Sequence, residues 1–560
     1  MSAFRPSSRA PALFRRKRRS LLPVILVVLV LLAGGGGYFL FLRDPEPPNP
    51  ERVRLVKACD VPEGILEKVW RGYVPGRSGD VLTIEQLPNQ YNTRHSTPFA
   101  YTQDVPLVLY GPGYIQSGVN SDRETTVADL APTFAELLDF EAPPEAVGKT
   151  LEEALLPKNK RNGIPKLIMT VVWDGGGDNV LEYWPESWPQ LKKLMADGAN
   201  YTQATVGSSP SITPSTHATM GTGAFPNRHG LADIKMRVKG KIVDAWEGSS
   251  PKYLRLDTVA DTWDLANDNV PLIGMMARDT WHLGMIGHGA YKQGGDHDIA
   301  IMDDLGDVEF RTNPDYYSMP DYVLGNEGLQ EAIDFIDQRD GEADQRWLDH
   351  PMLPIDGKIR YTPAWSLYQT EVMKEVLTTE GFGQDDVADL FYVNYKSTDL
   401  VGHEWNMIEP EERETLEEQD RQLGALVRFL NREVGRKSYV LAMTADHGQT
   451  PYPSETGGWN IIMAETAKDI DAEFDKVTPD KSLILSNRGY QIMFNKKELK
   501  RNEVEPADIA EFLRTYTIGD NAPSEDALGR FEDRTEERVF LTALTPDELK
   551  SALDCARKQD

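Results

Sequence analysis

Cysteine is almost absent from this 560-residue chain, which contains only Cys59 and Cys555. Two cysteines in so long a chain do not by themselves establish a disulfide, although they could pair in an oxidising compartment. Basic residues are also scarce: 60 Lys and Arg stand against 88 Asp and Glu, which leaves a formal net charge of −28. This acidic balance argues against nucleic-acid binding through a basic footprint.

The first twenty residues lack acidic side chains altogether and carry seven basic ones. They precede 22 uncharged residues, 21–42. As a helix this stretch would span about 33 Å, enough to cross a hydrocarbon core. A cleaved signal peptide is the alternative, but its apolar stretch would be shorter and would end in small residues before a cleavage site. We interpret 21–42 as an uncleaved transmembrane anchor in the cell membrane, with the basic tail in the cytoplasm and the remaining chain outside.

Composition divides the remaining chain into a spacer and a folded part. Residues 43–61 include PEPPNPE and are expected to form a stiff spacer. The stretch 156–165 is polar and contains Gly and Pro, which indicates a linker. It would join a first portion, 62–155, to a main portion, 166–560. Strands are expected at 80–87, 105–111, 167–174, 271–277, 389–395 and 438–446, and helices at 126–140, 187–198 and 410–435. Strands without clear alternation, separated by helices, favour an α/β fold with a mostly parallel sheet covered on both faces.

Three of the apolar runs end with an aspartate at or just past the tip, namely Asp174, Asp399 and Asp446. His403 completes a D-x-x-x-H motif with Asp399, and His447 follows Asp446 directly. A single aspartate at a strand end usually caps the next helix. Carboxylate and imidazole together suit Zn²⁺, and the D-x-x-x-H spacing places both side chains on one face of a helical turn. The full set therefore predicts a metal centre beyond the carboxyl ends of the strands.

The segment SSPSITPSTHATMGTGAFPNRHG, residues 208–230, is built to present a hydroxyl at the start of a helix. The free N–H groups of a helix start favour anions, and a bound divalent metal can activate a hydroxyl as a nucleophile. Spacing alone leaves four candidate hydroxyls: Ser211, Thr213, Ser215 and Thr216.

Together, Asp174, the P-x-x-T-x-x-x-H segment from Pro210 to His217, D-x-x-x-H and A-D-H-G resemble the alkaline phosphatase superfamily. The resemblance is closest to the branch with a threonine nucleophile, which includes the nucleotide pyrophosphatase/phosphodiesterases. It implies that Thr213 is the nucleophile and that two Zn²⁺ ions are bound, although other divalent metals are possible. By this resemblance, one ion takes Asp174, Asp446, His447 and Thr213, and the other takes Asp399, His403 and a further histidine.

The further histidine is normally supplied downstream of the D-H-G motif, but no histidine follows His447. In the family this ligand lies in a loop resembling T-H-G-S-P-Y, followed by a strand V-P-L-x-F-Y-G and a helix resembling D-I-A-P-T-L. This chain has TRHSTPFAY, VPLVLYGPG and VADLAPTFAELL in that order, but far upstream, at 93–138. The resemblance therefore implies a circularly permuted domain in which His95 is the missing ligand. A disulfide between Cys59 and Cys555 would then join the two ends where the permuted chain has been reopened.

The implied reaction is two-step phosphoryl transfer from a phosphate ester through Thr213. The family's monoesterases carry a K-D-R-like stretch where this chain has ARD, 277–279, and they carry an Asn that HGLADIK lacks. Fewer cations favour diesters, so we expect a membrane-anchored, extracytoplasmic phosphodiesterase resembling nucleotide pyrophosphatases. The alternatives are a phosphomonoesterase, a phosphotransferase acting on envelope lipid or glycan, and a catalytically silent surface scaffold. Candidate substrate-binding residues are Asn179, Arg278, His282 and His288.

Overall fold

The computed structural model describes residues 60–303, 308–324, 328–339, 341–353, 358–477 and 481–558. All of them belong to one compact unit, 55–560. The predicted anchor at 21–42, Cys59 and nearly all of the predicted spacer lie outside the described residues, so these interpretations stay predictions. Within the ranges that are described, no helix is both long enough and apolar enough to cross a bilayer.

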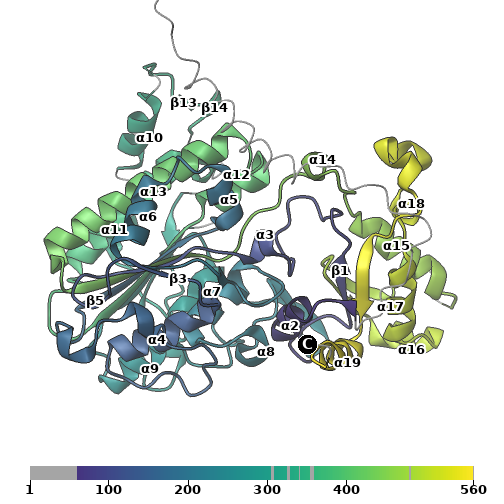
Figure 1. Ribbon diagram of the computed structural model, residues 1–560, viewed down its shortest axis with the longest axis horizontal. Helices are drawn as coiled ribbons and strands as arrows, with labels where there is room; N and C mark the ends of the chain where they lie inside the picture. The colour runs from purple at the N-terminus through teal and green to yellow at the C-terminus, as the bar shows by residue number, and fades with distance from the viewer. Residues whose placement is uncertain are drawn as a thin grey trace, which may run out of the picture. The chain divides into compact units, whose positions relative to one another are not determined.

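A nine-stranded sheet forms the centre of the unit (Figure 1). In spatial order its strands are β12 (Phe310–Arg311), β11 (Ile299–Asp303), β10 (Ile273–Ala277), β15 (Asp389–Tyr395), β5 (Leu167–Trp173), β16 (Tyr439–Ala445), β2 (Leu107–Tyr110), β6 (Ala199–Tyr201) and β3 (Val119–Ser121). The run from β11 to β16 is parallel, as the sequence predicts. The segment 105–111 also forms its predicted strand, but β2 runs antiparallel to both β16 and β6.

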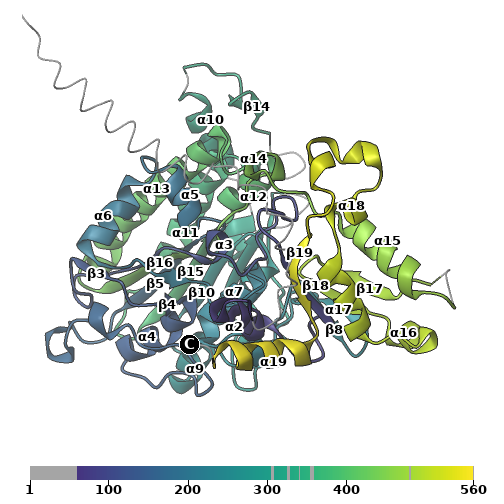
Figure 2. The same cartoon turned by 45° about the vertical axis from the view of Figure 1, so that its right-hand side comes forward.

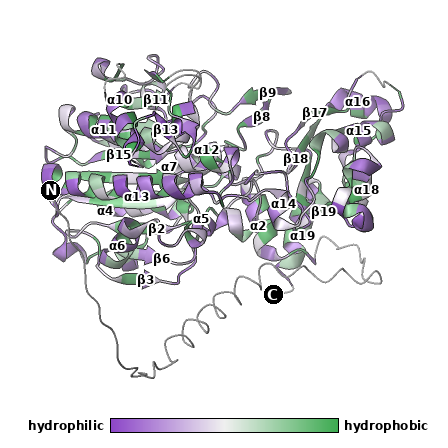
Figure 3. Ribbon diagram, turned by 90° about the horizontal axis from the view of Figure 1, so that it is seen from above, coloured by the Kyte–Doolittle hydropathy of each residue, from purple (hydrophilic) through white to green (hydrophobic). Residues whose placement is uncertain are grey.

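Alternate residues of the central strands enter two different hydrophobic cores. On one face, side chains such as Ile168 and Val172 pack with α4 (Leu130–Leu137), α7 (Thr213–Thr222) and α9 (Val259–Ala266). On the other face, Met169 and Val171 pack with α5 (Asp178–Tyr183), α6 (Pro189–Asp197), α10 (Leu329–Asp337), α11 (Pro363–Thr379) and α13 (Pro410–Leu430). Figure 3 shows hydrophilic residues on the visible side of α13, above hydrophobic strands. The prediction of a sheet covered on both faces is confirmed, and burial on both faces explains why these strands lack alternation.

A second, four-stranded antiparallel sheet was not anticipated from the sequence. Its order is β17 (Ile484–Asn487), β18 (Gln491–Phe494), β1 (Val81–Glu85) and β19 (Phe540–Leu544). Segment 80–87 does form a strand, but β1 pairs only with strands from the other end of the chain. Local pattern indicates that a strand exists, whereas its partners depend on contacts distant in sequence. The helices around this sheet are α15 (Met463–Phe474), α16 (Lys496–Asn502), α17 (Pro506–Thr515), α18 (Ile518–Asn521) and α19 (Pro546–Ala556).

The two ends of the described chain pack against each other. Helix α2 (Glu63–Gly72) lies beside α19 in Figures 1 and 2. Leu66 and Val69 of α2 share a buried apolar cluster with Leu549 and Leu553 of α19. Arg557 also donates to the Glu63 carboxylate, with Nε and Oε1 3.1 Å apart. The proximity that the predicted permutation demands is therefore present, and Cys555 lies within α19, one residue before its end.

Helix α2 also holds the chain that leads to the start of α7. The Ser209 amide donates to the Lys68 carbonyl over 2.9 Å. A Cβ on Gly72 would lie 1.8 Å from the Ser209 carbonyl oxygen, whereas a Cβ on Gly64 would meet nothing within 4 Å. Gly72 is therefore required by a close backbone approach, and Gly64 is not.

We expect Gly72→Ala to lower the free energy of unfolding by about 1–3 kcal/mol, because the backbone of α2 and Ser209 must separate. Gly64→Ala, on the same helix, is the matched control. It should be neutral or stabilising by about 0.4–1 kcal/mol through the unfolded state. Urea denaturation midpoints at unchanged slope would measure both changes. Equal midpoints for the two variants would contradict this packing of α2.

Candidate active site

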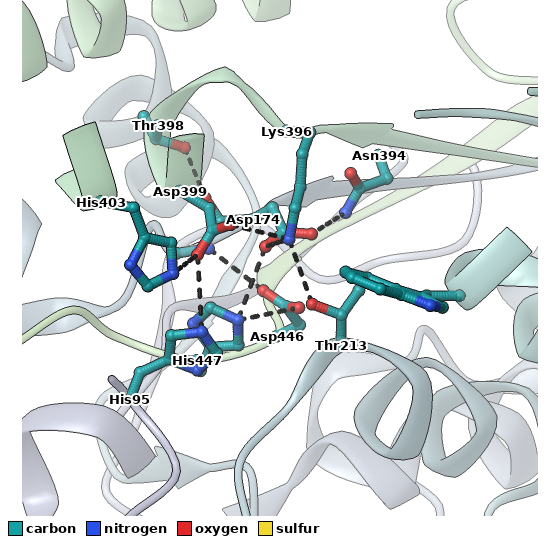
Figure 4. A network of polar contacts seen from close by, with 12 residues as sticks. His95, Asp174, Thr213, Asn394, Lys396, Thr398, Asp399, His403, Asp446 and His447 are labelled. Atoms are coloured by element: carbon teal, nitrogen blue, oxygen red, sulfur yellow. Dashed lines mark hydrogen bonds and ion pairs between the residues drawn. The ribbon is translucent and has the colours of Figure 1, made fainter. Parts of the chain in front are cut away.

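The carboxyl ends of three adjacent parallel strands meet at one edge of the central sheet. Asp174 directly follows β5, and Asp446 and His447 directly follow β16. Asp399 and His403 lie in α12 (Ser397–Glu404), which begins after β15. Because β15, β5 and β16 are neighbours and parallel, the side chains that follow them converge (Figure 4).

The structure distinguishes among the four candidate hydroxyls. Thr213 is the first residue of α7, and its Oγ1 accepts a hydrogen bond from Lys396 Nζ over 3.1 Å. The hydroxyl of Ser211 donates to the His95 carbonyl over 2.6 Å, and that of Ser215 donates to the Leu231 carbonyl over 2.9 Å. Thr216 Oγ1 is buried and has no hydrogen-bond partner within the ranges that the structure describes. Of these four hydroxyls, only that of Thr213 contacts Lys396, whose ammonium group is bound to Asp174 and Asp399.

Two sets of ligand atoms flank this hydroxyl. Asp399 Oδ1 lies 3.3 Å from His403 Nε2 and 3.6 Å from His95 Nε2. His447 Nε2 lies 3.5 Å from Asp174 Oδ1 and 3.3 Å from Asp446 Oδ2. Ligands about 2.0–2.1 Å from a tetrahedral Zn²⁺ stand about 3.3–3.4 Å apart. The ligand atoms of Asp174, Asp446 and His447 all lie within 4.8 Å of one another, and so do those of His95, Asp399 and His447, a spacing that fits a divalent ion. His403 contacts Asp399 but completes neither group at that distance among the described residues.

Three of these ligand atoms make no hydrogen bond within the described part of the chain. Asp399 Oδ1, Asp446 Oδ2 and His447 Nε2 are buried and have no hydrogen-bond partner among the described residues. Buried polar atoms without a partner are costly and rare in folded proteins. A cation bound in each ligand set would give these three buried atoms the partners that they lack.

Each of the three histidines has its other ring nitrogen engaged. The Nδ1 atoms of His95 and His447 contact the carbonyls of Ser211, at 2.8 Å, and Gly448, at 3.0 Å. A carbonyl accepts only, so Nδ1 carries the proton in both rings and Nε2 is left free to bind a metal. His403 Nδ1 contacts the Thr93 hydroxyl over 3.0 Å. Burial, together with the neighbouring His447 ring, lowers the pKa of His95 well below its usual value and keeps the ring in the neutral form that binds metals.

Lys396 and Asn394 were missed in the sequence interpretation. Lys396 Nζ contacts Asp174 Oδ1 at 2.6 Å and Asp399 Oδ2 at 2.9 Å, and Asn394 Nδ2 donates to Asp174 Oδ2 over 3.0 Å. Burial opposes the charge of Lys396, but the carboxylates of Asp174 and Asp399 outweigh it and raise its pKa. A lysine three residues before the D-x-x-x-H aspartate was the available signal.

His282 is the one predicted substrate-binding residue that contacts the cluster. Its Nε2 lies 3.3 Å from Asp174 Oδ2, and its Nδ1 lies 3.3 Å from Asp279 Oδ1. Burial opposes protonation of this ring, but Asp279 and Asp174 raise its pKa to about 9. A protonated His282 would hold Oδ2 of Asp174, whereas Lys396 and His447 approach Oδ1.

The other predicted substrate-binding residues have different surroundings. Asn179 donates to the Gln449 carbonyl over 2.6 Å, so it supports the chain that follows His447. His288 Nδ1 contacts Asp261 Oδ2 at 2.9 Å, away from the aspartates of the cluster. Arg278 is half-buried, and its Nε is buried without a hydrogen-bond partner among the residues described. None of these three has a recorded hydrogen bond or ion pair with the aspartate–histidine cluster.

The family model and the relatives reported below place this chain in the alkaline phosphatase superfamily, and the sheet agrees with that fold. The model of the type I phosphodiesterase/nucleotide pyrophosphatase family matches residues 168–549. This match covers more than half of the chain, and the chain therefore belongs to that family.

Alkaline phosphatases are among the similar proteins. PafA of Elizabethkingia meningoseptica is 21% identical over 428 residues, which cover 66% of this chain and 76% of that protein. PhoV of Synechococcus elongatus is 28% identical over 163 residues, 28% of this chain and 29% of that protein. A crystal structure of a PafA variant has a TM-score of 0.50 at 19% identity, covering 62% of this chain and 76% of that one. The structural likeness concerns the fold, and the family and the relatives make this chain a phosphoric ester hydrolase.

Proposed function

We propose that this chain is a zinc-dependent phosphodiesterase resembling nucleotide pyrophosphatases, with Thr213 as the nucleophile. One observation carries the proposal. Thr213 Oγ1 lies 3.1 Å from an ammonium group that is itself bound to Asp174 and Asp399, one carboxylate from each ligand set. A hydroxyl between two such sets is where a two-metal phosphoryl-transfer centre needs its nucleophile.

Each residue has a defined role in the proposed reaction. Asp174, Asp446 and His447 would hold one Zn²⁺ beside Thr213, and Asp399, His403 and His95 would hold the other. When bound, the ions supply Lewis-acid stabilisation of the charge on the attacking and leaving oxygens. Thr213, at the first position of α7, presents its oxygen to phosphorus, where the helix start favours an anion. The carbonyls of Ser211 and Gly448 fix the orientation of the His95 and His447 rings.

The arrangement of the chain supports the predicted permutation. In this proposal, 62–155 is the relocated C-terminal portion, joined to 166–560 by the segment 156–165. His95 reaches the ligand set from the upstream portion, and β2 inserts beside β16. The packing of α2 on α19 closes the reopened junction, where we propose the Cys59–Cys555 disulfide. Anchoring through 21–42 would hold the domain on the outer side of the membrane.

A comparison of two aryl phosphate substrates tests the proposed function. We expect the full-length protein, loaded with zinc in a mild detergent, to hydrolyse a diester with a higher kcat/KM than the matched monoester. Removal of the ions by a chelator should abolish both activities, and added zinc should restore them. A monoester preference would instead indicate an alkaline phosphatase, as PafA and PhoV are. Turnover only in the presence of an acceptor alcohol would indicate a transferase, and inertness under all conditions a scaffold.

A further inference from the structure

Lys396 is neither a proposed metal ligand nor the proposed nucleophile, yet its side chain contacts both. It follows β15 directly, and its side chain is 4% exposed. Figure 4 shows its ammonium group between Asp174, Asp399 and Thr213. Three contacts hold it there: 2.6 Å to Asp174 Oδ1, 2.9 Å to Asp399 Oδ2 and 3.1 Å to Thr213 Oγ1.

The ammonium group takes one ligand atom of the metal sets, Asp174 Oδ1, and makes no hydrogen bond to the others. It uses Oδ2 of Asp399, whereas His403 and His95 face Oδ1 of that carboxylate. In the described part of the chain, Asp399 Oδ1, Asp446 Oδ2 and His447 Nε2 remain without hydrogen-bond partners although Lys396 is close by. A lysine that merely replaced a metal ion would satisfy those atoms. Lys396 therefore adds a positive charge beside the two sets.

We propose that Lys396 is a catalytic residue that donates a hydrogen bond to a non-bridging oxygen of the phosphoryl group transferred to Thr213. This inference rests on the proposed function. In a near-attack arrangement the phosphorus atom lies about 3–3.5 Å from the attacking oxygen. A donor 3.1 Å from that same oxygen is within reach of the oxygens that surround the phosphorus.

The step is balanced with Lys396 protonated throughout. Thr213 releases its hydroxyl proton to solvent, and its Oγ1 forms a bond to phosphorus. The bond between phosphorus and the alcohol oxygen breaks, and its electron pair leaves on that oxygen, which takes a proton from water. The products are a phosphothreonine and an alcohol. The ammonium group stabilises charge on the non-bridging oxygens, as fixed cations do in other phosphoryl-transfer sites.

The same contact makes Lys396 a determinant of substrate charge. A phosphate monoester carries more negative charge on its non-bridging oxygens than a diester does, so an ammonium group at this point favours the monoester more. The stretch Ala277-Arg278-Asp279 has no lysine, and Arg278 has no recorded contact with the cluster. Lys396, which follows β15, supplies one cation where the K-D-R-like stretch of the family's monoesterases supplies two. It therefore narrows the expected diester preference without reversing it.

The test compares Lys396→Met with wild type and with Lys374→Met in the full-length protein. Lys374 pairs with Glu371 on the surface of α11, outside the cluster. We expect Lys396→Met to lower kcat/KM for an aryl monoester by about 10²–10³-fold, the usual effect of removing a charge-stabilising donor. The diester should lose a clearly smaller factor. Zinc content by mass spectrometry should stay at the wild-type value, and Lys374→Met should match wild type throughout.

Orthophosphate binding by calorimetry separates this inference from the proposed function, because it needs no turnover. Zinc-loaded Lys396→Met should bind orthophosphate at least tenfold more weakly than wild type. Equal binding by the two proteins overturns the inference, even if both hydrolyse esters. Tighter zinc binding by Lys396→Met with undiminished phosphate binding also overturns it, because the lysine would then be a competitor of the metal. Weakened phosphate binding without ester hydrolysis supports the role of Lys396 and counts against the proposed function alone.

Discussion

Thr213→Ala is expected to lower kcat for phosphate esters by about 10⁴–10⁶-fold, the range found when a covalent nucleophile is removed. The reason is chemical, because a methyl group cannot form the phosphothreonine on which the two-step reaction depends. Metal content should remain unchanged, because the six proposed aspartate and histidine ligands are all still present. Five of them are held by β5, β16, α12 and their connections, and the sixth is His95. Initial rates on an aryl phosphate, together with zinc analysis of the same samples, measure both effects.

Two neighbouring variants control this experiment. Thr213→Ser keeps a hydroxyl at the start of α7 and should retain most of the turnover. Ser215→Ala removes a hydroxyl that donates to the Leu231 carbonyl, so it should affect stability more than catalysis. If Thr213→Ala remained active while Ser215→Ala or Ser211→Ala did not, the nucleophile would have to be reassigned within the same segment.

His95→Ala is expected to lose one metal ion and most of the turnover. His95 Nε2 lies 3.6 Å from Asp399 Oδ1 in the set completed by His403. Without it only two protein ligands remain, which is too few for a stable zinc site, and zinc should fall from about two ions per chain to about one. Turnover should fall by more than the roughly 10–100-fold that follows loss of an outer partner of a ligand.

His350→Ala is the matched control for His95→Ala. His350 Nε2 also contacts a carboxylate, Glu411 Oε1 at 2.9 Å, but this pair lies outside the cluster. Its loss should change neither zinc content nor rate. If His95→Ala bound as much zinc as wild type and kept its turnover, both the assigned ligand and the functional basis of the permutation would be wrong. Zinc titration followed by activity gives the result directly.

The sequence was sufficient for features that depend on local pattern and residue chemistry. The strands around Leu167, Asp389 and Tyr439 and the long helix after Pro410 were predicted within a few residues. Continuous apolar runs between amphipathic helices leave little other than a buried parallel sheet. Aspartates after three such runs had to converge, because the carboxyl ends of adjacent parallel strands share an edge.

The tertiary structure decided what depends on contacts distant in sequence. Local pattern showed that 80–87 is a strand but not that β1 belongs to a second sheet. It left four hydroxyls open, and only the fold showed that Thr213 faces Lys396 while Ser211 and Ser215 donate to carbonyls. Its one signal for Lys396, a lysine three residues before the D-x-x-x-H aspartate, did not show that the side chain reaches Asp174. Lys396 contacts Asp399 of α12 and Asp174 after β5 at the same time, and only the folded chain brings Asp174 to it.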